Sequence, residues 1–280
     1  MRTQLEKFDR FKALHSGEQA FVMPNPWDAG STRILDALGF DALATTSAGY
    51  AFSAGKRDSF AGLGREEILE NAAAIVAATD LPVSADLEDG FGASPQACGD
   101  TIALACDIGL VGGSIEDATG DETAPIYGLS EATDRVAAAV EAAKGRPFLL
   151  TARAENFLWG RPDLDDTIRR LQAFCDVGAD VLYAPGLPDL DAIRTVCNAV
   201  DKPVNVVMGL QGPTYSVEEL SKVGVKRISV GGSMARAALG ALRRAALEVR
   251  ETGTFSYAAD GYPGAELAQL MEQGKAPDRQ

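Results

Sequence analysis

Three carboxylates stand within four residues in the segment Val83-Ser84-Ala85-Asp86-Leu87-Glu88-Asp89-Gly90-Phe91-Gly92. The segment begins as an apolar, strand-like run after Pro82 and ends among glycines. Acidic groups this close repel one another unless a cation or hydrogen-bond donors neutralise them. The segment alone allows two interpretations: a solvated acidic turn, or a divalent-metal site at the end of a buried strand. Hard cations such as Mg²⁺ prefer carboxylate oxygens and retain several waters.

The elements that must position these acids are predicted by short apolar runs that alternate with helical patterns along the 280 residues. Eight strand–helix units in a chain of this length are typical of a (β/α)8 TIM barrel, an α/β fold. The alternative is a doubly wound open sheet, but no GxGxxG run follows the first strand, which counts against a dinucleotide-binding fold. We expect strands at 21–24, 42–47, 82–86, 113–117, 147–153, 181–185, 203–207 and 227–230.

The connections and the domain organisation are predicted from the same pattern. We expect a glycine-containing loop at 48–64, and a helix that begins at Pro95 with Ser94 as its N-cap. Ser216 and Glu219 form a capping-box pattern. Residues 1–280 are expected to form a single TIM-barrel domain. Within it, 253–280 is a C-terminal extension whose own helix runs from Gly264 to about Gln273.

Composition excludes several classes of function. A net charge of −14 and a pI near 4.6 argue against a nucleic-acid partner and against an anionic membrane surface. No stretch approaches the roughly 20 apolar residues of a membrane span, and the N-terminus has no signal-peptide core. The four cysteines form no CxxC pair, so we expect free thiols and a cytoplasmic protein. His15 is the single histidine and is expected on the surface of a polar N-terminal helix.

Polar residues collect where the predicted strands end, which is where a TIM barrel has its active site. The residues at these ends are Ser47, Ala48, Gly49, Asp58, Asp86, Glu88, Asp89, Glu116, Asp117, Arg153, Glu155 and Asn205. Carboxylates from neighbouring strands should converge on one side, with the arginine across from them. This arrangement favours a metal site combined with an anion-binding site.

Five segments resemble the isocitrate lyase/phosphoenolpyruvate mutase superfamily, and the resemblance extends from Pro24 to the last barrel helix. They are Thr46-Ser47-Ala48-Gly49, Gly55-Lys56-Arg57-Asp58-Ser59, Asp86-Leu87-Glu88-Asp89-Gly90-Phe91-Gly92, Ser114-Ile115-Glu116-Asp117 and Thr151-Ala152-Arg153. The third is the most specific, because it matches the DxDxGxG signature with glutamate at the second acidic position. The resemblance implies a TIM barrel whose last helix is exchanged between the subunits of a homodimer or homotetramer. It also implies Mg²⁺ chemistry, or Mn²⁺ in its place, on small 2-oxo or 2-hydroxy carboxylates.

The resemblance also implies separate roles for these residues. The implied metal ligands are Asp86, which binds directly, and Asp58, Glu88 and Glu116, which act mostly through metal-bound waters. The implied substrate-binding residues are Ser47, Ala48, Gly49, Arg153 and Asn205, and the implied catalytic residues are Arg153, Asp58 and Glu116. Arg153 would clamp an anion, because its planar pair of donors fits a carboxylate. The alternative for Arg153 is a structural salt bridge to Glu116 or Glu155.

These roles predict a Mg²⁺-dependent lyase that cleaves a C–C bond of a small 2-oxo or 2-hydroxy carboxylate through a metal-stabilised pyruvate enolate. An oxaloacetate decarboxylase and a methylisocitrate or dimethylmalate lyase-like enzyme both fit. One alternative is a P–C bond enzyme, of the phosphonopyruvate hydrolase or phosphoenolpyruvate mutase kind. Another is a non-catalytic barrel that binds a 2-oxo acid. A third is a sugar-phosphate isomerase or aldolase, if Val230-Gly231-Gly232-Ser233 is a phosphate cradle rather than a tight turn.

One segment departs from the family pattern. The superfamily lyases carry a Lys-Lys-Cys-Gly-His run after the fourth strand, and its cysteine protonates the enolate. Residues 118–128 contain no Cys, Lys or His, which argues against a standard isocitrate or methylisocitrate lyase. Tyr127, Asp121 and Glu122 are candidate proton donors, and this long polar loop has the character of an active-site lid. Solvent-exposed loop residues are the alternative for all three.

Overall fold

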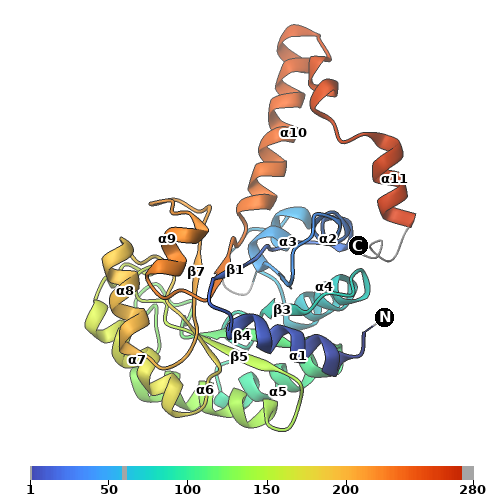
Figure 1. Cartoon of the computed structure of the whole chain (residues 1–280). Helices are drawn as coiled ribbons and strands as arrows, with labels where there is room; N and C mark the ends of the chain where they lie inside the picture. The colour runs from blue at the N-terminus through green and yellow to red at the C-terminus, as the bar shows by residue number, and fades with distance from the viewer. Residues whose placement is uncertain (1, 59–61, 273–280) are drawn as a thin grey trace.

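Eight parallel strands form a nearly closed barrel with helices between them, in the part of the chain that the computed structural model describes, residues 2–58 and 62–272 (Figure 1). The order in the sheet is β1-β8-β7-β6-β5-β4-β3-β2, so every strand except β1 lies beside its successor or predecessor in sequence. The expected TIM barrel is therefore confirmed. The strands are β1 (Phe21–Met23), β2 (Leu43–Ala44), β3 (Val83–Asp86), β4 (Gly112–Glu116), β5 (Leu149–Arg153), β6 (Val181–Tyr183), β7 (Val204–Val207) and β8 (Arg227–Ser229).

The seam between β1 and β2 is joined by few hydrogen bonds. The Ala44 amide donates to the Pro24 carbonyl at 3.0 Å. The buried Asn25 side chain adds three bonds: Nδ2 donates to the Thr45 carbonyl at 2.8 Å, and Oδ1 accepts from Val230 N at 2.9 Å and Gly231 N at 3.0 Å. One amide side chain therefore connects the ends of β1 and β2 with the turn after β8.

The helices begin at the residues that the capping patterns predict. Ser94 caps the helix that opens with Pro95, and the capping box of Ser216 and Glu219 is formed. The helices are α1 (Gln4–His15), α2 (Ala29–Ala37), α3 (Ser47–Ser53), α4 (Arg65–Ala77), α5 (Pro95–Asp107), α6 (Leu129–Ala143), α7 (Leu164–Asp176), α8 (Leu190–Ala199), α9 (Val217–Lys222), α10 (Ser233–Thr252) and α11 (Gly264–Glu272), with a 3₁₀ turn at Ser256–Asp260.

The prediction of a loop at 48–64 is wrong for its first part, because the helix α3 occupies 47–53. Thr46 is extended and its hydroxyl accepts from the Gly49 amide at 3.2 Å, which is the geometry of an N-cap. Gly49 has no room for a side chain, since a Cβ there would lie 3.1 Å from Trp27 Cβ and 3.2 Å from Ala235 Cβ. The small residues of this segment allow α3 to pack closely on α10. Ser59 of the resemblance lies outside the described residues.

The N-terminal helix α1 packs against the barrel and buries its only histidine. Phe11 is fully buried against a cluster that includes Met23 and Leu149. His15, expected on the surface, is only 6% exposed, so that expectation is wrong. Its ring packs edge-on against Phe11 and Phe21, and Nδ1 lies 2.8 Å from the Phe11 carbonyl oxygen. Burial, reinforced by the charge of Arg227, lowers the pKa of His15 to about 3, so the ring is neutral near pH 7.

The last barrel helix, α10, points away from the barrel, and α11 returns beside α2 (Figure 1). Ala235 is the buried residue of α10, while Leu239 and Leu242 are 43% and 64% exposed. Arg33 of α2 donates a hydrogen bond to the Met271 carbonyl of α11. Gln273, the expected end of this helix, lies outside the described residues. None of the described helices has the length and apolar character that a membrane span requires.

Candidate active site

A cavity of about 640 Å³ opens where the barrel strands end. Most of the expected site residues line it: Ser47, Ala48, Asp58, Asp86, Glu88, Glu116, Arg153, Glu155 and Asn205. Gly49, Asp89 and Asp117 are not among the described residues that line it. The parallel strands bring together side chains that are far apart in the sequence, as a barrel of this kind requires.

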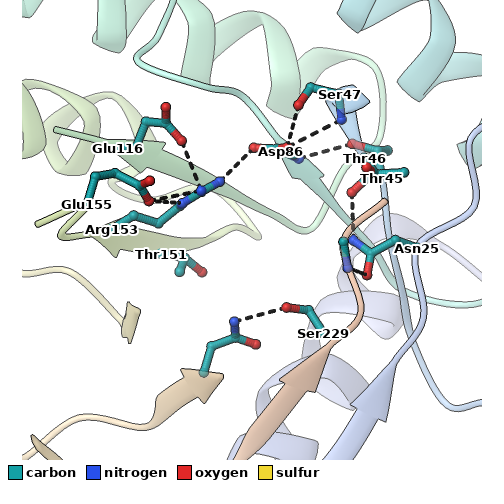
Figure 2. Close-up of polar contacts among 12 residues, drawn as sticks. Asn25, Thr45, Thr46, Ser47, Asp86, Glu116, Thr151, Arg153, Glu155 and Ser229 are labelled. Atoms are coloured by element: carbon teal, nitrogen blue, oxygen red, sulfur yellow. Dashed lines mark hydrogen bonds and ion pairs between the residues drawn. The ribbon is translucent and has the colours of Figure 1, made fainter. Parts of the chain in front are cut away.

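Asp86, the last residue of β3, connects two parts of the cavity (Figure 2). Its Oδ2 accepts hydrogen bonds from the Ser47 hydroxyl at 2.9 Å and from the Ser47 amide at 3.3 Å. Its Oδ1 accepts from Arg153 Nη1 at 3.0 Å. The start of α3 and the end of β5 are thus held to one carboxylate, and Asp86 lies at the centre of the polar network.

Arg153, the last residue of β5, lies among the acids and not across from them as expected. Besides Asp86, it contacts Glu116 Oε2 through Nη2 at 3.1 Å, and its Nε donates to Glu155 Oε1 at 2.9 Å (Figure 2). Burial disfavours the charged guanidinium, but the surrounding carboxylates outweigh it and raise the pKa of Arg153. The salt bridges considered as the alternative role are therefore present, and they involve both Glu116 and Glu155.

The cavity is lined by more carboxyl groups than Arg153 contacts. Burial, followed by repulsion from Asp86 and two other acids, raises the pKa of Glu88 to about 8. Burial also raises the pKa of Glu116 well above its ordinary value, despite the contact with Arg153. Desolvation and the charge of Asp86 raise the pKa of Asp58. A cation bound among these carboxyl groups would favour their charged forms and offset the effect of burial.

Glu88 is placed by a strained backbone. Its φ is 47°, in the left-handed region where residues other than glycine are uncommon. Its carbonyl accepts from the Glu116 amide at 2.9 Å, which fixes this conformation to the end of β4. Such conformations cost about 1–3 kcal/mol and persist where the surroundings enforce them. The side chain of Glu88 is thereby directed to the cavity that it lines.

The described carboxylates of the cavity do not form a complete protein cage for a divalent cation. Among residues 2–58 and 62–272, no group of three or more His, Cys, Asp or Glu side chains is arranged to hold a metal ion. A protein cage for Mg²⁺ is not required, however, since this ion is commonly held by one or two carboxylates and keeps several waters. Asp86, with Asp58, Glu88 and Glu116 in the same cavity, is a donor set of that chemistry.

The three residues of the expected carboxylate pocket, Ser47, Ala48 and Gly49, have different hydrogen-bond partners and different positions relative to the cavity. Ser47 gives both its hydroxyl and its amide to Asp86. Ala48 lines the cavity. The Gly49 amide is bound by Thr46, so it is occupied within the helix N-terminus. The Val230–Gly231 turn is occupied in the same way by Asn25, which matches a tight turn rather than a phosphate cradle.

Two of the expected acids, Asp89 and Asp117, form buried ion pairs and do not line the described cavity. Asp89 Oδ2 lies 3.2 Å from Arg135 Nη2, and both side chains are at most 5% exposed. Asp117 Oδ2 accepts from Arg170 Nη1 at 2.9 Å, and its Oδ1 accepts from the Glu155 amide at 2.8 Å. Both ion pairs are buried, so losing one partner would leave an uncompensated charge. These pairs fix the loops after β3 and β4.

The loop after Glu116 folds back on itself beside the site. Thr119 N donates to the Pro125 carbonyl at 2.9 Å, and Tyr127 N donates to the Asp117 carbonyl at 2.8 Å. The Arg135 guanidinium lies 4.3 Å from the centre of the Tyr127 ring. Tyr127, Asp121 and Glu122 are not among the described residues that line the strand-end cavity.

Several residues of the cavity were missed by sequence reasoning. Tyr183, the last residue of β6, lines it with its ring centre 5.0 Å from the Arg153 guanidinium. Arg227 donates from Nε to Asn205 Oδ1 at 2.8 Å, and Asn205 Nδ2 donates to Ser229 Oγ at 3.1 Å. Arg236, in the first turn of α10, also lines the cavity. The position of Tyr183 at the carboxyl end of a strand was a signal that could have identified it. Arg227 begins β8 and Arg236 lies beyond it in α10, so the strand-end rule points to neither.

The chain is similar to a protein family and to several known proteins. The family described as phosphoenolpyruvate phosphomutase matches residues 11–250. A solved structure from Burkholderia cenocepacia J2315, described only in general terms as a lyase/mutase, is 55% identical, with 96% of each chain covered and a TM-score of 0.93. The 2-methylisocitrate lyase of Shewanella oneidensis is 25% identical, over 95% of this chain and 98% of its own. The oxaloacetate decarboxylase of Rhodopseudomonas palustris is 26% identical, over 95% and 92%.

The family match covers the barrel and its strand-end cavity, and the segments that carried the resemblance lie within it. This chain belongs to the phosphoenolpyruvate mutase/isocitrate lyase superfamily.

Proposed function

We propose that this protein is a Mg²⁺-dependent carbon–carbon lyase that acts on a small 2-oxo or 2-hydroxy carboxylate and forms pyruvate or a close analogue through its enolate. The observation that carries the proposal is the position of Asp86. Its carboxylate lies between Ser47 and Arg153, in a cavity that Glu88 and Glu116 make strongly acidic. The relatives named 2-methylisocitrate lyase and oxaloacetate decarboxylase support this reaction class.

The residues divide the work of metal and substrate binding. Asp86 would hold the metal directly, and Asp58, Glu88 and Glu116 would hold it mostly through waters. When bound, Mg²⁺ supplies Lewis-acid stabilisation of the negative charge that develops on the 2-oxo oxygen. Manganese has similar oxygen preferences and could replace it.

Arg153 would orient the substrate carboxylate and stabilise charge in the transition state. Its guanidinium is already held by three carboxylates, so it is fixed before substrate arrives and needs little reorganisation. Ser47 and Ala48 line one side of the substrate position, and Asn205 lines another. The Asn205 amide is oriented by Arg227 and Ser229, which fixes the donor and acceptor that it can present.

A substrate panel tests this proposal. Oxaloacetate, 2-methylisocitrate, 2,3-dimethylmalate and phosphonopyruvate are incubated with the protein and Mg²⁺ or EDTA, and products are identified by mass spectrometry. We expect Mg²⁺-dependent C–C cleavage of at least one of the first three, and Mg²⁺-dependent binding of oxalate in a thermal-shift assay. Asp86→Ala should abolish both. Asp191→Ala, at an 87% exposed carboxylate on α8, is the matched control and should change neither.

The outcomes separate the alternatives. Oxalate binding without turnover of any compound would support a non-catalytic barrel. Cleavage of phosphonopyruvate alone would support P–C bond chemistry. Oxalate binding that survives Asp86→Ala would show that the metal and substrate lie elsewhere.

We also propose that the protein assembles by exchange of its last barrel helix, as a homodimer or homotetramer. Leu239 and Leu242 of α10, and Phe255, Tyr257 and Tyr262 after it, are between 42% and 64% exposed in the isolated chain. A helix that points away from its own barrel with exposed apolar side chains is suited to a partner subunit.

A further inference from the structure

The proposed reaction needs a proton donor. Cleavage of a C–C bond beside a 2-oxo group leaves an enolate, and its carbon C3 must gain a proton before pyruvate is released. The superfamily lyases use a cysteine in the loop after the fourth strand, which this chain lacks. Tyr127 in that loop is packed against Arg135, away from the strand-end cavity. The donor must therefore come from another element.

The described lining of the strand-end cavity contains no cysteine, histidine or lysine. Glu116 and Glu155 are held by Arg153, and Asp86 is shared between Arg153 and Ser47. Asp58 and Glu88 also line the cavity, and in the proposed function they must be ionised to hold the waters of the metal, so they are not free to donate a proton. Serine and threonine hydroxyls are much weaker acids than a phenol. Among the described lining residues, Tyr183 is the one phenol, and its ring packs against the Arg153 guanidinium.

Tyr183 is placed where a substrate bound by Arg153 would lie. It ends β6, and in the sheet register it pairs with Arg153 on one side and Asn205 on the other. Its ring lies under the Arg153 guanidinium, 5.0 Å from centroid to carbon. Ser229, the last residue of β8, lines the same cavity and is held by Asn205. Tyr183 therefore lies between the two expected substrate-binding residues.

We propose that Tyr183 is the general acid that protonates C3 of the enolate. The Oη–H bond of Tyr183 breaks as a C3–H bond forms from the C2–C3 π electrons, and the C2–O⁻ group becomes a carbonyl. The products are a 2-oxo acid and a tyrosinate, and a new proton from the solvent that enters the open cavity restores the phenol. This inference rests on the proposed enolate chemistry.

The surroundings suit this role. Burial raises the pKa of the Tyr183 phenol, with Arg153 opposing the shift, so the proton is present at neutral pH. The carbon acid formed is weaker still, so transfer is favourable. The transient tyrosinate would lie beside the Arg153 cation, which stabilises it.

Hydrogen exchange at the methyl group of pyruvate tests the assignment. Each exchange event removes a proton from C3 to form the enolate and then adds a proton back to C3, so it requires the proposed proton transfer in both directions. The full-length protein with Mg²⁺ and pyruvate in D₂O is followed by proton NMR. Tyr183→Phe keeps the ring beneath Arg153 and removes only the hydroxyl. We expect exchange to fall at least about 100-fold, the usual minimum for a lost general acid, while Mg²⁺-dependent oxalate binding stays within about twofold. Tyr127→Phe is the matched control and should exchange at the wild-type rate.

The outcomes distinguish this inference from the function on which it rests. Exchange by Tyr183→Phe within about threefold of wild type would overturn the assignment and leave the lyase proposal intact. The same conclusion follows if Tyr127→Phe, and not Tyr183→Phe, loses exchange. A wild-type protein that binds oxalate but cleaves none of the panel and exchanges no deuterium would overturn the enolate chemistry and the role of Tyr183 together.

Discussion

Glu88 should make Mg²⁺ binding depend on pH near neutrality. Its pKa is raised to about 8 by burial and by neighbouring acids. At pH 7 only about one molecule in eleven then has an ionised Glu88, so a metal that needs the carboxylate binds about tenfold more weakly than at high pH, a difference of about 1.4 kcal/mol. Because binding selects the ionised form, Glu88 alone should release about 0.9 proton per Mg²⁺ at pH 7.

Isothermal titration calorimetry measures both quantities. Mg²⁺ is titrated between pH 6 and 9 in pairs of buffers with different ionisation enthalpies, which gives affinity and proton release. Glu88→Gln removes this titrating group and should reduce both the pH dependence and the proton release by the share that Glu88 contributes. Glu131→Gln, an exposed glutamate in α6, is the control and should keep the wild-type slope. A wild-type affinity that is constant over this range, or an unchanged slope in Glu88→Gln, would refute the reasoning.

Four further outcomes follow from the contacts described above. Without metal, folded Glu88 binds a proton more tightly than the unfolded chain does, so the free energy of unfolding should fall, by at most about 1.4 kcal/mol per pH unit, as pH rises from about 4.5 to about 8; urea unfolding of wild type and Glu88→Gln checks this, and equal slopes would contradict it. Arg153→Lys should weaken oxalate binding more than Mg²⁺ binding, because lysine cannot make the paired contact; equal losses in calorimetry would indicate a purely structural role. Arg135→Met should lower stability by about 3–5 kcal/mol in urea unfolding, because it leaves Asp89 buried and unpaired; a loss below about 1 kcal/mol would contradict this. Leu242→Glu should lower the molar mass measured by light scattering without changing the circular dichroism, and a wild-type monomer would rule out helix exchange.

The barrel could be predicted because its strands are short apolar runs that end in polar residues. Buried parallel strands leave this pattern, and Asp86, Glu116 and Arg153 are the last residues of three of them. The helix α3 was missed because Ala and Gly between 48 and 55 suit a loop equally well. Thr46 was its only clear signal, as an N-cap.

Side-chain partners were less accessible to sequence reasoning. Arg153 was expected across from the acids, and its place among them depends on the stagger of β4 and β5, which brings Glu116 and Arg153 into register. His15 was assigned to the surface from the average polarity of its helix. Its spacing of four from Phe11 was the available sign that both lie on the buried face. Tyr183 is the last residue of β6, so the rule that active-site residues stand at the carboxyl ends of the strands predicts it.

The seam joined by Asn25 has a consequence for the order in which the barrel is made. Strands β2 to β8 each pair with a neighbour in sequence, so pairing can proceed as the chain leaves the ribosome. The strand partner of β1 is β8, where Phe21 pairs with Arg227, and the Asn25 side chain must also reach Val230 and Gly231. Closure is therefore a late event of synthesis. Chains that stop before Arg227 are expected to remain open sheets with exposed edges, the form in which strands most readily aggregate.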